Sequence, residues 1–88
     1  MEQTIEVGLD GKVVAVPRDV VNAIAAAAAA RAGVSGRHRD LSLHLSRALE
    51  TGQVTLGEAE VRALVAVFEE EHPEDFGPAA AELRRAAA

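Results

Sequence analysis

The sequence contains no cysteine, no tryptophan and no tyrosine, and its only aromatic residues are Phe68 and Phe76. The absence of cysteine excludes disulfides, thiolate zinc sites and cysteine nucleophiles, so the chain needs no oxidising compartment. With two aromatic rings, it offers almost no surface on which unpaired bases could stack. One lysine stands beside eight arginines and 19 alanines, a bias typical of a GC-rich bacterial or phage gene.

Long hydrophobic runs are also missing. The apolar run from Ala23 to Ala30 is far shorter than the roughly 20 residues that a membrane-spanning helix needs. Glu2 and Glu6 lie in a strand-like N-terminal pattern that does not resemble a signal peptide, so we expect a cytoplasmic protein. The formal net charge of −5 argues against a protein that mainly neutralises phosphates.

The pattern of elements predicts an α+β fold, mainly α, in a single domain over residues 1–88. An N-terminal β-hairpin is expected at 4–16, because apolar residues alternate there around Asp10-Gly11, a preferred type I′ turn. Leu9 should then face Lys12, and one face should gather Ile5, Val7, Leu9, Val14 and Val16. An isolated hairpin is only marginally stable, so this face must pack on helices or on the strands of another copy.

Three to four short helices should follow, at about 18–32, 37–51, 58–71 and 79–85. Pro17 and Asp19 favour the start of the first helix, and Gly33 is expected to end it. The alanines at 25–30 predict a thin helix that its neighbours approach closely. An exposed alanine-rich helix with one buried stripe remains the alternative.

Glycine and hydroxyl residues predict the ends of the next two helices. Ser35 is the best N-cap for the second helix, and Gly52 should end it. Thr55 or Gly57 should cap the third helix, and the spacing of Thr55 and Glu58 is that of a capping box.

Residues that could support catalysis are scattered along the chain. His38, His44 and His72 have no nucleophile or base at a diagnostic spacing, and no phosphate-binding or cofactor motif is present. Glu69 and His72 stand three residues apart, but no second histidine is near, so a metal site is not expected. The sequence therefore predicts a protein that is not an enzyme and takes no cofactor.

The segment GVSGRHRD, at 33–40, is the candidate binding site. It places Ser35, Arg37, His38 and Arg39 at the start of a helix, where cations oppose the helix dipole unless something negative compensates. An anion, a nucleic-acid phosphate or an acidic partner segment would supply that charge. The alternative is a solvated turn that Asp40 and nearby glutamates neutralise.

A second candidate is an interface for self-association. Leu43 points away from the apolar stripe of its helix, and the third helix has a second, shallow apolar face. One small core should not need both faces, so the sequence predicts a homodimer. The candidate interface residues are Leu43, Ala59, Ala63, Ala66 and Val67.

Together these patterns favour a small protein-interaction or regulatory module that self-associates through its helices. The competing hypothesis is a DNA-binding regulator of the helix-turn-helix type, built on the second and third helices. The third helix opens with Glu58 and Glu60, so any DNA contact would fall to Arg37, Arg39 and Arg47. A small enzyme is a distant third.

Overall fold

The chain runs from a β-hairpin through two helices into a third strand and then into two further α-helices. The computed structural model describes residues 3–71 and 73–87, and the expected α+β class, mainly helical, is confirmed. The elements are β1 (Thr4–Leu9), β2 (Lys12–Pro17), α1 (Arg18–Ala30), α2 (Gly36–Thr51), β3 (Gln53–Leu56), α3 (Glu58–Glu70), the 3-10 helix η1 (Pro73–Phe76) and α4 (Pro78–Ala87).

The hairpin has the predicted register, with Leu9 opposite Lys12 at the turn. Both central residues of the turn have positive φ, 47° at Asp10 and 84° at Gly11, as a type I′ turn requires. The predicted apolar face is turned inward: Ile5, Val7, Leu9 and Val16 are buried, and Val14 is half-buried.

The strand β3 was not predicted from the sequence. It pairs in parallel with β1, and the N–H of Glu6 donates a hydrogen bond to the carbonyl of Gly52 at 3.0 Å. Thr55 lies inside this strand, so the predicted capping box of Thr55 and Glu58 is wrong, and Gly57 is the N-cap of α3. A parallel pair needs a long crossover, which α1 and α2 provide here.

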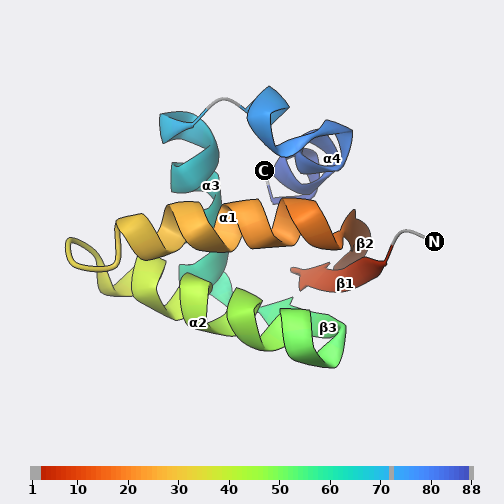
Figure 1. Cartoon of the computed structure of the whole chain (residues 1–88), viewed down its shortest axis with the longest axis horizontal. Coiled ribbons are helices and arrows are strands. Elements are labelled where there is room, and N and C mark those ends of the chain that lie inside the picture. Colours follow the sequence, from red (N-terminus) through yellow and green to blue (C-terminus); the bar gives the residue numbers. More distant parts are fainter. Residues whose placement is uncertain (1–2, 72, 88) are drawn as a thin grey trace.

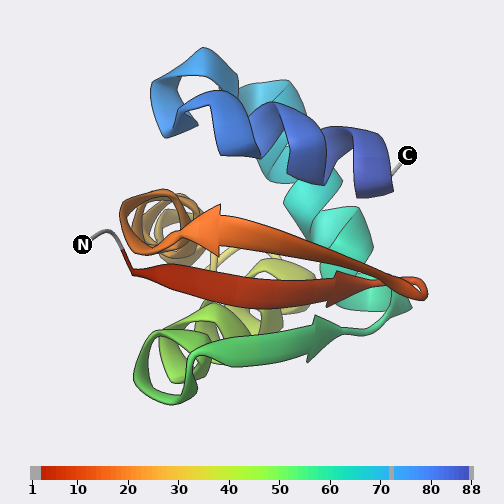
Figure 2. The same ribbon diagram turned by 90° about the vertical axis from the view of Figure 1, so that its right-hand side faces the viewer.

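The helices cover one face of the sheet, whose strand order is β2-β1-β3. Figure 2 shows α1 and α2 behind the three strands, with α4 beside β2. The inner face of the sheet therefore meets the buried sides of the helices in one core. The largest fully buried side chains are those of Phe68, Ile5, Leu9, Ile24, Leu41, Leu64, Leu83, Val7, Val16, Val21 and Val67.

The alanine-rich helix α1 matches both alternatives in part. It packs against α2, α3 and the hairpin, and Ala25 and Ala28 are buried in the core. The methyl groups of Ala26, Ala29 and Ala30 are exposed. Because alanine adds so little bulk, neighbouring elements approach the buried side of this helix closely.

The helix α1 ends earlier than predicted. Its C-cap is Arg31, with φ −104°, and the N–H of Arg31 donates to the carbonyl of Ala28 at 3.1 Å. Gly33 does not adopt the left-handed conformation, so the prediction that it caps this helix is wrong. Gly52, in contrast, ends α2 with φ 86°, as predicted.

Both apolar faces of α3 are covered in part by the chain itself. The helix packs against α1, α2 and α4, and Ala63 and Val67 are buried in the core. The ring of Phe76, from η1, meets that of Phe68 edge to face, with the ring centroids 5.8 Å apart. The prediction that Ala63 and Val67 face outward is therefore wrong, because elements of the same chain bury both side chains.

Candidate functional site

The turn between α1 and α2 projects from one end of the molecule (Figure 1). A Cβ placed on Gly33 or Gly36 would meet no other atom within 4 Å. Val34 lies between these two glycines, and its side chain is 93% exposed. A large apolar side chain is thus presented to solvent on a turn that the rest of the chain does not cover.

Two of the predicted site residues, Arg37 and Arg39, are exposed in the first turn of α2. Neither makes an ion pair with any residue in the described part of the chain. Ser35 is the N-cap of α2, as predicted, but its side chain makes no capping hydrogen bond. We call Val34, Ser35, Arg37 and Arg39 the basic turn.

His38 does not join the basic turn. Its spacing places it on the face of α2 that buries Leu41 and Leu45. Both ring nitrogens are buried, and neither has a hydrogen-bond partner among the described residues. A nitrogen without access to solvent cannot reach an anion at the surface, so His38 belongs to the core side of the helix.

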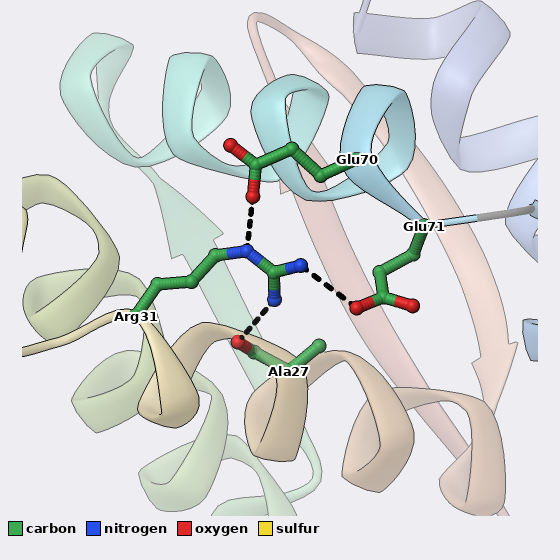
Figure 3. Close-up of polar contacts among 4 residues, drawn as sticks. All are labelled: Ala27, Arg31, Glu70 and Glu71. Carbon is green, nitrogen blue, oxygen red and sulfur yellow. Dashed lines mark hydrogen bonds and ion pairs between the residues drawn. The ribbon is translucent and has the colours of Figure 1, made fainter.

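A cluster around Arg31, which was not predicted from the sequence, lies beside the basic turn (Figure 3). The guanidinium donates through Nε to Glu70, through Nη2 to Glu71 at 2.7 Å, and through Nη1 to the carbonyl of Ala27 at 2.7 Å. The hydrogen bonds to Glu71 and Glu70 raise the pKa of Arg31 above its ordinary value. Arg31 therefore ties the end of α1 to the end of α3.

Acidic side chains gather at the end of α3. Glu69 and Glu70 are exposed and Glu71 is half-buried, even though Arg31 binds Glu70 and Glu71. We call Glu69, Glu70 and Glu71 the acidic end. Because Arg31 stands three residues before Val34 and contacts this segment, the basic turn and the acidic end are neighbours at one end of the molecule.

The predicted interface residue Leu43 lies on the outer side of α2 and is 61% exposed. Arg39 and Arg47, one turn away on either side, are also exposed. On α3, Ala59 is exposed and Ala66 is half-buried. The structure therefore keeps an outward Leu43 but removes most of the alanine face with which it was expected to pair.

The other histidine in a described position, His44, lies beside the start of α3. Its Nδ1 is 2.8 Å from Oε1 of Glu60, which is an ion pair when the imidazole is protonated. The spacing of Glu69 and His72 cannot be examined, since His72 lies outside the described residues. Within residues 3–71 and 73–87, no three His, Asp or Glu side chains are grouped as metal ligands.

The connection between α2 and α3 bears on the DNA-binding hypothesis. A helix-turn-helix joins its two helices by a turn of about three or four residues. Here the strand β3 lies between α2 and α3 and pairs with β1. In the structure these two helices are therefore not joined by the short turn on which the competing helix-turn-helix hypothesis was built.

Beyond this end of the molecule, a depression of about 430 Å³ opens between the hairpin turn, the start of α3 and the end of α4. Charged residues, including the paired Arg62 and Glu58, line it.

None of the described helices has both the length and the apolar character required to cross a bilayer. Comparison with protein families, with characterised proteins and with solved structures finds no match for this chain.

Proposed function

We propose that this protein is a non-enzymatic protein-interaction module that binds an acidic partner segment through the basic turn. One observation carries the proposal: an almost fully exposed valine stands close in sequence to two exposed arginines that form no ion pair with any described side chain. An apolar anchor with adjacent cations fits a protein surface that offers an apolar pocket and carboxylates. The exposed Leu43, one turn beyond Arg39, extends the same surface along α2.

A protein partner fits this surface better than nucleic acid. The net charge is −5, and the acidic end lies at the same end of the molecule as the basic turn, where it would repel phosphates. Asp40 and Glu50 are also exposed on α2, among its arginines. Such mixed charges suit a specific protein surface, whereas a duplex presents continuous rows of phosphate. A cytoplasmic location accords with a chain that has no cysteine to oxidise.

The test compares two double variants of equal charge change. Arg37→Glu with Arg39→Glu alters the basic turn, and Arg84→Glu with Arg85→Glu alters exposed arginines on α4, away from that turn. Quantitative affinity capture from the source cells should show proteins that the first variant loses and the second retains. The same retention profile for both variants would contradict the proposal.

Duplex DNA provides the competing outcome. We expect no more than weak binding of the wild type to a short duplex at low salt, with no difference between the two variants. Tight binding that weakens steeply with salt, and that only Arg37→Glu with Arg39→Glu abolishes, would favour a DNA-binding regulator instead.

A further inference from the structure

We propose that the partner of the basic turn is a second copy of this chain, docked at the same end of the molecule. The inference rests on the proposed function and names the occupant of that surface. It starts from the neighbourhood of two patches of opposite charge, the basic turn and the acidic end, which the hydrogen bonds of Arg31 place side by side. Each copy thus carries both halves of a complementary contact.

A two-fold axis satisfies both halves at once. When the axis passes between two neighbouring patches, rotation places each patch over the opposite patch of the other copy. The basic turn of one copy would then face Glu69 of the other, and the reverse contact would form by symmetry. In Figure 1 the end of α1 lies between the start of α2 and the end of α3, so such an axis would pass at the end of α1.

The exposed Val34 supplies the apolar part of this contact. It is 93% exposed on a turn that extends past the end of α3 along the long axis of the molecule (Figure 1). A two-fold pairing would carry the turn of each copy beside the acidic end of the other. Burial of Val34 would add hydrophobic stabilisation to a contact that is otherwise electrostatic.

The size of this end indicates how strong the contact can be. The two shorter extents of the molecule are 25 Å and 23 Å, so a flat contact across this end would span a cross-section of about 575 Å². Stable interfaces bury about 800 Å² per partner. We therefore expect weak association, with a dissociation constant on the order of 0.1 mM, that weakens further as salt screens the charges.

The alternative pairing through Leu43 is less favourable. If two α2 helices crossed antiparallel at Leu43, residues equally far from it in opposite directions would meet. Arg39 of one copy would then face Arg47 of the other, twice in each dimer, and like charges at that distance repel. The end of the molecule pairs opposite charges, whereas the outer face of α2 pairs like charges.

Sedimentation analysis of four purified proteins tests the proposal. They are the wild type, Arg37→Glu with Arg39→Glu, Glu69→Lys, and Arg84→Glu with Arg85→Glu as the control of equal charge change. Concentrations should run from about 10 µM to about 1 mM, at about 20 mM and about 500 mM salt. Far-UV circular dichroism establishes first that each variant is folded.

We expect the wild type and the α4 control to associate at low salt, and the other two variants to associate at least tenfold more weakly. An equimolar mixture of Arg37→Glu/Arg39→Glu with Glu69→Lys should recover association, because each restores the charge pair that the other lost. A wild type that stays monomeric at about 1 mM in low salt overturns the proposal. So does a mixture that associates no better than its components.

The same variants separate this proposal from the proposed function. If the wild type is monomeric but Arg37→Glu/Arg39→Glu still loses a cellular protein in the capture experiment, the second copy is not the occupant and the interaction module stands. If neither association nor capture depends on the basic turn, both proposals are overturned.

Discussion

Replacement of Arg31 by alanine should be the most informative single change at this end of the molecule. Among the described residues, Arg31 alone joins the C-terminal end of α1 to the C-terminal end of α3 by side-chain hydrogen bonds. The change removes two ion pairs and one hydrogen bond to a helix carbonyl. It leaves the buried apolar residues in place, so the native fold should persist with reduced stability.

The magnitude follows from how exposed each partner is. The carboxylates of Glu70 and Glu71 are 53% and 40% exposed, so solvent screens both ion pairs and each contributes about 0.5 kcal/mol. The Arg31 side chain is only 22% exposed, and its bond to the carbonyl of Ala27 contributes about 1 kcal/mol. We therefore expect Arg31→Ala to lower the free energy of unfolding by about 2 kcal/mol.

Urea denaturation at pH 7 measures this loss. The chain has no tryptophan or tyrosine, so far-UV circular dichroism is the suitable probe. For a domain of this size the dependence on urea is about 1 kcal/mol per molar, so the midpoint should fall by about 2 M. Because the pKa of Arg31 is raised, its contribution is complete at pH 7, which lies below the unfolded-state pKa, and on the alkaline side it is lost only as the pH rises through the folded-state pKa.

Arg62→Ala is the matched control, since Arg62 forms a 2.8 Å pair with Glu58 in which the two side chains are 65% and 82% exposed. That change should shift the midpoint by less than about 0.5 M. Arg31→Lys keeps the charge but cannot make all three contacts, so it should fall between alanine and the wild type. Equal shifts for Arg31→Ala and Arg62→Ala would refute the reasoning.

Three further changes can be measured by the same denaturation. Gly11→Val should lower the free energy of unfolding by about 1–2 kcal/mol, because a β-branched residue is strained at φ 84°. Gly33→Ala should be nearly neutral, and equal effects of the two substitutions would contradict the assignment of a type I′ turn. His38→Leu should raise it by about 1 kcal/mol, because two buried ring nitrogens lack a partner, and a lower midpoint would show that the imidazole has one. Val67→Asp should unfold the chain by burying a charge, while Leu43→Asp should leave its stability within about 0.5 kcal/mol; a folded Val67→Asp would contradict the core described above.

Local signals in the sequence determined the hairpin and most helix ends. The strands alternate around Asp10-Gly11, and that turn type requires the positive φ that these two residues adopt. Pro17 marks the start of α1 because its ring fixes φ at a value that suits the start of a helix. Gly52 marks the end of α2 because, without a Cβ, it adopts a positive φ at little cost. Features fixed within a few residues could be predicted for that reason.

The position of the basic turn could also be predicted, but its neighbours could not. Arg31 binds Glu70 and Glu71, which lie 39 and 40 positions away in the chain, and no local pattern specifies such a contact. His38 looked like part of the turn, yet its place on the helix directs its ring nitrogens into the interior. Proximity in sequence grouped residues that the fold separates.

Only the tertiary structure decided what covers each apolar face. The segment Gln53–Leu56 is too short to be recognised as a strand from its sequence pattern. It becomes a strand because the edge of β1 offers it backbone hydrogen bonds. The second apolar face of α3 suggested a partner chain, but the chain's own elements bury Ala63 and Val67. A hydrophobic pattern predicts that one face of an element must be buried, whereas the three-dimensional packing determines which other element covers that face.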